Sequence, residues 1–472
     1  MSDQFDVVVV GAGTGGYVAA IRAAQLGLST AVVERQPSLG GTCLNWGCIP
    51  TKALLEHAHA LKMAQDGADW GITFGTPGAK PAIDMARVHA RKLKIVTGLT
   101  KGVEFLFKKN KIEWIKGHAR LAGGGRIDVS GERPRSLTGR EIIIATGSSP
   151  RSLPGITIDR TQIITSDEAI NLAAIPKSMA IMGSGAVGVE FASIFRRFGS
   201  EVTLIELQNR LVPNEDEAIS AELEKAFRKR GIKSRTGATV TSAVASGAGV
   251  TIEMTSGGKS ETLVVETLLV AIGRSPVTDG LGAVELGVTL ERGFVKVDEL
   301  FRTNVPGVSA IGDVITMSGA PHAQLAHLSS AEGVLLAERI AGRDVQPINY
   351  DHVPACTYCD PEIGSVGLTE RDAIDRGFDV RVGTFPFGVL GRAKIAGEIE
   401  GFVKIVGEKK YDELLGVHMI GARSTELVAE ATVALRLEST VEELMRTIHP
   451  HPTMSEGIGE AAHAALGGAI HS

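Results

Sequence analysis

The fold of this chain is decided near its start, where Phe5-Asp-Val-Val-Val-Val-Gly-Ala-Gly-Thr-Gly-Gly16 leads into a helical pattern over residues 17–26. The residues before the first glycine predict a buried strand. Gly11 permits a tight turn, Gly13 lets the backbone approach a pyrophosphate, and Gly16 lets the strand and the helix pack closely. This order of strand, glycines and helix predicts a dinucleotide site at the N-terminus of the helix, where backbone N–H groups attract an anion.

The same pattern occurs again 172 residues later, where a predicted strand over residues 178–182 leads into Gly183-Ser-Gly185-Ala-Val187-Gly188 and a helix. In each copy the next predicted strand ends in a glutamate, Glu34 in the first and Glu206 in the second. A carboxylate there can accept hydrogen bonds from the hydroxyls of a ribose but would repel the 2′-phosphate of NADP. The sequence therefore predicts a duplicated dinucleotide-binding domain, with NAD(H) in the second copy.

Two of the four cysteines, Cys43 and Cys48, lie in the stretch 40–52, Gly-Gly-Thr-Cys-Leu-Asn-Trp-Gly-Cys-Ile-Pro-Thr-Lys. Five residues of regular helix span about 7.5 Å, which exceeds the roughly 4.4–6.8 Å Cα separation of a disulfide. A bridge here therefore needs an irregular turn, which Gly47 and Pro50 could provide. So few cysteines favour a catalytic or metal-binding pair over a structural disulfide. Two buried, inert thiols are the alternative interpretation.

Composition indicates a multidomain α/β protein. The 472 residues suggest three domains, and 57 Gly with only 4% aromatic residues favour α/β packing. Because the net charge is −5 without a basic run, we expect no nucleic-acid or membrane partner. No stretch has the length of a membrane span. A strand pattern already begins at Phe5, which leaves no room for a signal peptide, so we expect a cytoplasmic protein.

Further predicted strands end in residues that suit a ligand. The strand 141–147 ends in Gly-Ser-Ser-Pro, and the strand 267–273 repeats its pattern. Another predicted strand, 301–313, ends in Asp313. Ligands of open α/β sheets bind at the carboxyl ends of the strands, so Asp313 is a candidate cofactor contact; a helix N-cap or turn aspartate is the alternative. An amphipathic helix is predicted over residues 90–108, and we assign it no chemistry.

After residue 350 the pattern changes to antiparallel strands, which are followed by two helices. The predicted strands lie within residues 355–368, 379–386, 401–406 and 414–420. This pattern predicts a separate α+β domain. The domain ends in His449-Pro-His451-Pro-Thr-Met-Ser-Glu456. A histidine near a carboxylate can serve as a base near neutral pH, and a surface His-Pro loop is the alternative.

Taken together, these motifs resemble the flavoprotein disulfide reductases, which transfer electrons between a pyridine nucleotide and a disulfide. The resemblance spans essentially the whole chain, and it implies two doubly wound, Rossmann-like domains plus a C-terminal α+β dimerisation domain. The implied segments are 1–150 for the first part of the FAD-binding domain, 151–277 for the NAD-binding domain, 278–348 for the second, central part of the FAD-binding domain, and 349–472 for the dimerisation domain.

The resemblance also implies which residues hold the cofactors. Glu34 would contact the adenosine ribose of FAD and Asp313 its flavin side, while Lys52 would lie beside the flavin with Glu190 as its ionic partner. The further residues expected around FAD are Gly11, Gly13, Gly16, Gly117, Thr146, Gly147, Ser148, Gln324, Leu325, Ala326 and His327. The residues expected around NAD are Gly183, Gly185, Val187, Gly188, Glu190, Glu206, Val240 and Gly273.

The implied activity is oxidation of protein-bound dihydrolipoamide to lipoamide, with reduction of NAD+ to NADH through a Cys43–Cys48 disulfide. His451, oriented by Glu456, would take the proton of the dithiol, and both residues would come from the partner subunit of a homodimer. The implied partners are the lipoyl-carrying proteins of 2-oxo-acid dehydrogenase or glycine cleavage complexes. An NADH-dependent reductase of another low-molecular-weight disulfide is the alternative, and a binding protein that keeps the fold without turnover is another.

In two places the chain departs from the pattern of that family. The segment between Asp313 and Leu325 is several residues longer than usual, which leaves the register of the flavin-capping residues open. Cys356 and Cys359 form a Cys-x-x-Cys pair in a predicted interface strand. A single such pair is weak support for zinc, so we expect two packed thiols and no metal. We expect His322, His352, His418 and His463 to be ordinary surface or core histidines.

Overall fold

The computed structural model describes residues 3–74, 80–317 and 322–472, and the chain forms two compact units. Unit 1 comprises residues 1–53, 86–151 and 273–348. Unit 2 comprises residues 54–85, 152–272 and 349–472. Residues 318–321, which belong to the segment of open register after Asp313, lie outside the described residues.

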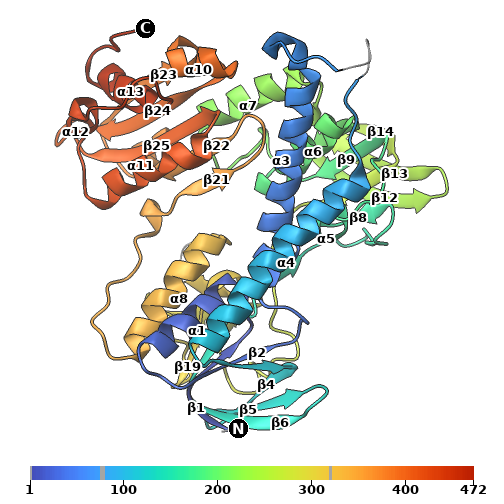
Figure 1. Cartoon of the computed structure of the whole chain (residues 1–472), viewed down its shortest axis with the longest axis vertical. Helices are drawn as coiled ribbons and strands as arrows, with labels where there is room; N and C mark the ends of the chain where they lie inside the picture. Colours follow the sequence, from blue (N-terminus) through green and yellow to red (C-terminus); the bar gives the residue numbers. More distant parts are fainter. Residues whose placement is uncertain (1–2, 75–79, 318–321) are drawn as a thin grey trace. The chain divides into compact units, whose positions relative to one another are not determined.

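Unit 1 is built on a sheet with the strand order β3-β2-β1-β6-β5-β4, in which β19 pairs with β6 (Figure 1). Strands β1, β2, β3, β6 and β19 are parallel, so the carboxyl ends of β1, β2, β6 and β19 lie at one edge. Val7 to Val9 are fully buried in this sheet, as the unbroken valine run predicts. The strands of the sheet are β1 (Gln4–Val10), β2 (Thr30–Glu34), β3 (Glu113–Lys116), β4 (His118–Gly123), β5 (Arg126–Ser130), β6 (Arg135–Ile144) and β19 (Val308–Ala310).

Helices α1 (Thr14–Gln25) and α8 (Ala326–Ile340) lie side by side in unit 1 (Figure 1). The two helices are in close contact at Gly333 of α8, where a Cβ would lie only 2.6 Å from the carbonyl oxygen of Gly15 in α1. The remaining elements that lie wholly in unit 1 are α2 (Gly41–Asn45), β7 (Ser148–Pro150), β16 (Arg274–Pro276), β17 (Leu290–Glu291), β18 (Phe294–Val297), η2 (Gly312–Val314) and β20 (Ile315–Met317). Helices α3 (Cys48–Gln65) and α4 (Met85–Lys109) extend across unit boundaries.

The prediction of one strand over residues 301–313 is wrong, because only Val308–Ala310 forms a strand there. Phe301 has a φ of +66°, which is incompatible with an extended strand. Gly307 has a φ of +77°, and the chain turns between these two residues. Asp313 itself lies in the short 3-10 helix η2 that follows the strand.

Unit 2 contains a second parallel sheet, of order β11-β10-β9-β15-β8. A three-stranded antiparallel sheet, β12-β13-β14, accompanies it. Helix α6 (Ala186–Phe198) follows β9 in the way that α1 follows β1. The other elements of this part are η1 (Gly67–Trp70), β8 (Ile163–Ile164), α5 (Ser166–Ala169), β9 (Ser178–Met182), β10 (Glu201–Ile205), α7 (Glu217–Lys229), β11 (Lys233–Arg235), β12 (Ala238–Ser246), β13 (Gly249–Ser256), β14 (Lys259–Val265) and β15 (Thr267–Val270).

The C-terminal part of unit 2 is an antiparallel sheet of order β21-β22-β25-β24-β23 (Figure 1). Three helices follow its last strand, α11 (Ser424–Arg436), α12 (Val441–Arg446) and α13 (Glu456–Leu466), so the prediction of two helices is wrong. The short α12 was missed because its pattern covers under two turns. The other elements are η3 (Tyr350–His352), β21 (Ala355–Thr357), β22 (Ile363–Gly367), α9 (Glu370–Asp375), β23 (Val380–Pro386), η4 (Phe387–Val389), α10 (Gly391–Ala396), β24 (Gly401–Glu408) and β25 (Leu414–Gly421).

Glycines let α11 and α13 pack on one face of this sheet. A Cβ on Gly364 would lie 2.2 Å from the carbonyl oxygen of Ser424 in α11, and one on Gly383 would lie 2.1 Å from that of Ala461 in α13. The opposite face carries polar side chains on three adjacent strands, where Lys404 and Ser365 are the cross-strand neighbours of His418. The α/β fold with two dinucleotide-binding domains and a C-terminal α+β domain is thus confirmed. No helix among the described residues has the length and apolarity needed to cross a bilayer.

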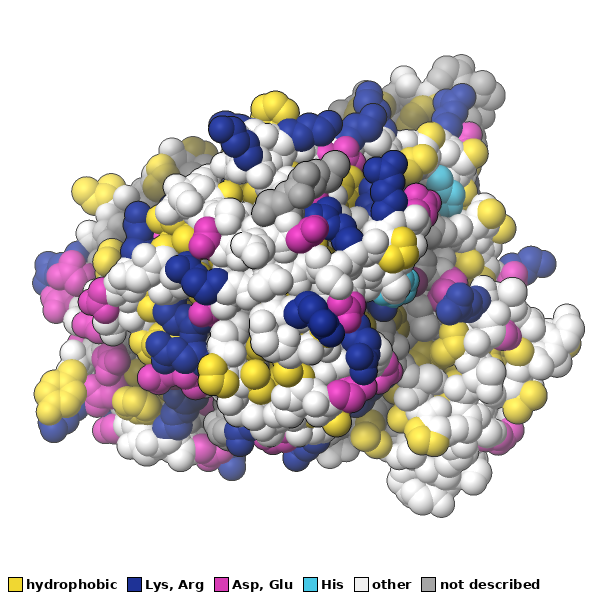
Figure 2. Space-filling view, turned by 90° about the horizontal axis from the view of Figure 1, so that it is seen from below, with side chains coloured by type: hydrophobic (Ala, Val, Ile, Leu, Met, Phe, Trp, Pro, Cys, Tyr) yellow, Lys and Arg dark blue, Asp and Glu magenta, His cyan; other side chains and the backbone are white. Residues whose placement is uncertain are grey.

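On the face of the molecule that Figure 2 presents, the side chains of Lys and Arg are interspersed with those of Asp and Glu.

Candidate functional site

The first glycine turn has the conformation that its sequence requires. Gly11 has a φ of +100°, and a Cβ there would lie 2.4 Å from the carbonyl oxygen of Ala145. A Cβ on Gly16 would lie 2.0 Å from the carbonyl oxygen of Gly11, so only glycine permits this contact between helix and strand. Gly13, the N-cap of α1, has an ordinary φ of −69° and open space at its Cβ position. No described residue comes within 4 Å of that position, which fits a ligand that approaches the backbone.

The second glycine turn repeats this geometry. Gly183 has a φ of +102°, and its Cβ would lie 2.3 Å from the carbonyl oxygen of Ala271. A Cβ on Gly188 would lie 2.0 Å from the carbonyl oxygen of Gly183. Gly185 again has open space at its Cβ position and caps α6 with a φ of −68°. Unit 2 therefore holds a second cradle that a dinucleotide fits.

Both predicted ribose-binding glutamates are buried at the ends of their strands. Glu34 Oε2 accepts a hydrogen bond from the N–H of Ala12 at 2.7 Å, and its Oε1 accepts one from the N–H of Gln36 at 2.8 Å. Glu206 accepts matching bonds from the N–H groups of Ser184 and Gln208, each at 2.8 Å. These bonds fix each carboxylate beside its glycine turn.

Cys43 and Cys48 lie together in unit 1 without a disulfide between them, and a side-chain hydrogen bond joins them. Cys43 belongs to α2 and Cys48 begins α3. The irregular turn predicted between them is present, since Trp46 and Gly47 interrupt the helix. The hydrogen bond that the Cys43 thiol donates to Cys48, together with burial, raises the pKa of Cys43 well above that of a free thiol, while the ammonium of Lys52 acts in the opposite direction. Cys43 therefore holds its proton at neutral pH.

A polar network in unit 1 surrounds Asp313. Its Oδ2 accepts a hydrogen bond of 2.5 Å from the hydroxyl of Ser148 and lies 3.9 Å from Nε of Arg274. Arg274 also donates to the Ser148 hydroxyl and carbonyl, each at 2.7 Å, and to the Thr42 hydroxyl at 3.5 Å. Since Thr42 precedes Cys43, the network connects the surroundings of the cysteines with Asp313. Gln324 donates from Nε2 to the carbonyl of Asp313 at 3.3 Å.

Sequence reasoning missed Arg274 and Thr42 as members of this network. Arg274 directly follows Gly273 in the motif that echoes residues 141–147. The repeat indicated a second strand ending but gave no sign that its arginine lies beside Ser148. That proximity arises from the antiparallel pairing of β16 with β7, which joins residues more than 120 positions apart.

Some of the remaining residues predicted around the cofactors have structural partners of their own. Thr146 donates its hydroxyl proton to the carbonyl of Val277 at 2.6 Å. A Cβ on Gly117 would lie 2.4 Å from the carbonyl of Ser130, so packing within the sheet already requires that glycine. Val240 is buried in the core of unit 2. Leu325 is the N-cap of α8, followed by Ala326 and the exposed His327. Gly147 and Gly273 have φ values of +72° and +107°, and Val187 is 39% exposed. Their cofactor contacts stay predictions.

The histidine and carboxylate predicted near the C-terminus are paired within unit 2. Nδ1 of His451 lies 2.7 Å from Oε1 of Glu456, and the N–H of Thr453 donates to Oε2 of the same carboxylate at 2.8 Å. Burial alone would raise the pKa of Glu456, but the bonds from His451 and Thr453 outweigh it and lower the pKa. The imidazole is 76% exposed. With Nδ1 engaged by the carboxylate, Nε2 is the atom that can exchange a proton with a substrate.

Glu190 and the second cysteine pair also lie in unit 2. Oε1 of Glu190 accepts a hydrogen bond from the N–H of Tyr358 at 3.0 Å. Cys359 is buried, which raises its pKa, and its thiol donates to the carbonyl of Pro361 at 3.1 Å. Cys356 contacts the carbonyl of Thr425 at 3.7 Å. The described residues contain no group of three or more His, Cys, Asp or Glu side chains that could hold a metal ion.

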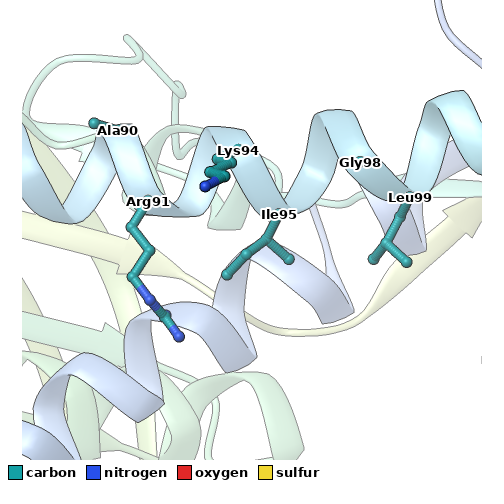
Figure 3. A pocket seen from close by; sticks show the side chains of 6 residues that line it. All are labelled: Ala90, Arg91, Lys94, Ile95, Gly98 and Leu99. Atoms are coloured by element: carbon teal, nitrogen blue, oxygen red, sulfur yellow. The ribbon is translucent and has the colours of Figure 1, made fainter.

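A surface depression of 840 Å³ lies along α4, lined by Ala90, Arg91, Lys94, Ile95, Gly98 and Leu99. Figure 3 shows Arg91, Ile95 and Leu99 on the same side of this helix. None of the predicted site residues lines it. We assign it no chemistry.

Comparison with known proteins identifies the family. Residues 5–333 match the family model of pyridine nucleotide-disulphide oxidoreductases, and residues 353–462 match the model of their dimerisation domain. The chain is 44% identical over its full length to the whole dihydrolipoyl dehydrogenase of Bacillus subtilis, and 43% identical to the mitochondrial dihydrolipoyl dehydrogenase of Pisum sativum, of which it covers 93%. The crystal structure of LpdA from Mycobacterium tuberculosis superposes with a TM-score of 0.88 at 27% identity, covering 98% of this chain and 99% of that one. The resemblance inferred from the motifs is thus confirmed, and the chain belongs to the pyridine nucleotide-disulphide oxidoreductase family.

Proposed function

We propose that this protein is a dihydrolipoyl dehydrogenase, which oxidises a dihydrolipoyl group on a carrier protein and reduces NAD+. The observation that carries the proposal is the side-chain hydrogen bond between Cys43 and Cys48, because two cysteines in contact can form a disulfide, and a disulfide can exchange with a substrate dithiol. The full-length similarity to dihydrolipoyl dehydrogenases supports the choice of substrate.

FAD fits the first glycine turn and NAD the second. The open space at Gly13 and at Gly185 would admit a pyrophosphate at the N-terminus of α1 and of α6. Glu34 and Glu206 would face the riboses, and Asp313, Ser148 and Gln324 would lie along the flavin side of FAD. When bound, the flavin supplies two-electron transfer between a dithiol and the nicotinamide. The carboxylate of Glu206 makes NAD rather than NADP the proposed nucleotide.

The first chemical step is removal of a proton from the dihydrolipoyl dithiol. Nε2 of His451 accepts this proton, while Glu456 holds the ring by its Nδ1 and stabilises the imidazolium that forms. The resulting thiolate attacks the sulfur of Cys43 in the oxidised Cys43–Cys48 disulfide. A mixed disulfide forms, and Cys48 leaves as a thiolate.

In the second step the other thiol of the substrate loses its proton and attacks the substrate sulfur of the mixed disulfide. Lipoamide leaves, and Cys43 is released and takes up a proton. The raised pKa of Cys43 favours this protonation. The negative charge then stays on Cys48, whose positive neighbour is Lys52, one helical turn further along α3.

The proposal includes a homodimer in which His451 and Glu456 of one subunit complete the cysteine site of the other. The match of residues 353–462 to a dimerisation domain supports this arrangement. It also includes the division into FAD-binding (1–150 and 278–348), NAD-binding (151–277) and dimerisation (349–472) segments. The proposed partners are the lipoyl-carrying proteins of 2-oxo-acid dehydrogenase or glycine cleavage complexes. The proposed location of the protein is the cytoplasm.

A steady-state assay with dihydrolipoamide as reductant tests the proposal. The purified protein should reduce NAD+ with dihydrolipoamide at least tenfold faster than with reduced glutathione or another low-molecular-weight thiol at equal concentration. Equal or higher rates with another thiol would contradict the choice of substrate. The absence of turnover with every thiol would contradict the catalytic function.

A further inference from the structure

A buried pair, His322 and Glu332, lies directly behind the turn that carries Asp313. Nε2 of His322 lies 2.6 Å from Oε1 of Glu332, and the side chains are 3% and 0% exposed. The other carboxylate oxygen, Oε2, accepts a hydrogen bond of 2.7 Å from the backbone N–H of Gly312. Glu332 therefore connects the imidazole with the residue that precedes Asp313. Neither residue takes part in the reaction described above.

The position of Glu332 in the fold joins both sides of the proposed FAD site. It belongs to α8, and its neighbour Gly333 packs against the backbone of Gly15 in the first turn of α1. Gly312 has a φ of +76°, and a Cβ on it would lie 3.1 Å from the hydroxyl of Ser329, also in α8. The same helix thus contacts the glycine turn of the first nucleotide site and the turn of Asp313.

Burial makes the partners of Glu332 energetically important. A buried carboxylate is costly unless hydrogen-bond donors replace the water that it has lost. Donors to a charged acceptor form shorter and stronger bonds than donors to a neutral one. An imidazole that donates to Oε1 keeps the carboxylate in place, and the carboxylate in turn keeps the N–H of Gly312 and the following Asp313 in place.

His322 lies between Asp313 and Leu325 in the sequence. We propose that His322 and Glu332 are positioning residues for FAD: the imidazole of His322 fixes Glu332, and Glu332 fixes the turn that presents Asp313 to the flavin side of the cofactor. The inference rests on the FAD site of the proposed function. It predicts that the strength of FAD binding depends on an N–H donor at position 322.

This dependence is tested by diluting the holoenzyme and monitoring the release of FAD through the fluorescence of the free cofactor. His322→Leu removes the donor and should raise the dissociation constant of FAD about tenfold. His322→Gln keeps an N–H at a similar reach and should restore the wild-type value to within about threefold. The matched control is His118→Leu, which alters an exposed histidine of β4 in the same unit and should leave FAD binding unchanged.

Excess FAD separates positioning from a general loss of structure. Added FAD should return His322→Leu to the wild-type kcat, because the reacting groups are intact once the cofactor is bound. Wild-type FAD affinity in His322→Leu would overturn the inference, and so would an equal loss of affinity in His322→Gln. If His322→Leu does not fold, Glu332→Gln tests the inference instead. We expect this variant to bind FAD several-fold more weakly, and unchanged FAD binding would contradict the inference. A wild-type protein that binds no FAD would instead contradict the proposed function itself.

Discussion

Glu206 occupies the same place in the second dinucleotide-binding domain as Glu34 does in the first. Each carboxylate accepts hydrogen bonds from the backbone N–H groups 22 residues before it and two residues after it. This correspondence at 172 residues' separation extends to the glycines, whose close contacts agree to within 0.1 Å. The two turns therefore share one geometry. The choice between the two proposed cofactors, FAD at the first turn and NAD at the second, must therefore arise from residues outside this shared geometry.

The Glu206 carboxylate should make the enzyme select NAD over NADP. A like-charge contact with the 2′-phosphate costs several kcal/mol, so kcat/KM should be about 100-fold higher for NAD. Glu206→Gln removes the charge and should reduce this preference to about tenfold. Steady-state kinetics with both nucleotides measure the ratio. A preference that survives the substitution unchanged would show that another residue selects the nucleotide.

Replacing Cys48 should separate cofactor binding from dithiol turnover. Cys48→Ser removes the sulfur that leaves as a thiolate, so activity with dihydrolipoamide should fall below about 1% of wild type. FAD content should be unchanged, since the glycine turn, Glu34 and Asp313 do not involve this sulfur. Cys359→Ser is the control, because its buried thiol lies in unit 2 and has no part in the mechanism. Full dithiol activity in Cys48→Ser would refute the exchange mechanism.

His451→Gln should lower kcat/KM for dihydrolipoamide by about 10²–10⁴-fold, the usual contribution of a general base. Glu456→Gln leaves the imidazole in place but removes its charged partner, so a smaller loss is expected. His471→Gln, which alters another exposed histidine paired with a glutamate, serves as the control. A loss below tenfold in His451→Gln would place the base elsewhere.

Lys404 should be a major contributor to the stability of unit 2. Its ammonium lies 2.8 Å from Asp216 and 2.7 Å from Glu370, and Lys404 and Asp216 are both buried. Lys404→Met leaves the carboxylate of Asp216 buried without this partner, which should cost about 3–5 kcal/mol of unfolding free energy. Lys409→Met breaks an exposed pair with Asp379 and should cost at most about 1 kcal/mol. Denaturant unfolding of the two variants measures both losses of unfolding free energy. Equal losses would contradict the role of burial.

The pair of His449 and Glu430 should make stability depend on pH. The hydrogen bond of 2.7 Å that Nε2 of His449 donates to the carboxylate of Glu430 raises the pKa of His449 above its usual 6.5. A raised pKa in the folded state means that the stabilisation is complete below pH 6.5 and is lost as the pH rises through the folded-state pKa. The melting temperatures of wild type and His449→Gln should therefore differ most below pH 6.5 and converge as the pH rises above the folded-state pKa. A difference that grows with pH would contradict this sign.

The sequence was most informative where local chemistry dictates the backbone. The positive φ of Gly11 and the close contact of Gly16 follow from the strand, glycine and helix pattern alone. By contrast, nothing local indicated that Phe301 would adopt a φ of +66° and shorten the strand before Asp313. The partners of Arg274 and of His322 depend on pairing between distant segments. His322 in particular was expected to be an ordinary histidine, because single histidines carry no signal of the buried carboxylate they meet.

The most direct test of the account is an anaerobic titration of the purified protein with dihydrolipoamide, followed by NAD+, while visible absorbance and free thiols are recorded. We expect one dihydrolipoamide per subunit to reduce the Cys43–Cys48 disulfide, to release two protein thiols and to change the flavin spectrum. NAD+ should reverse these changes. A flavin that responds to NADH but not to dihydrolipoamide, with the cysteines still oxidised, would contradict the proposed function.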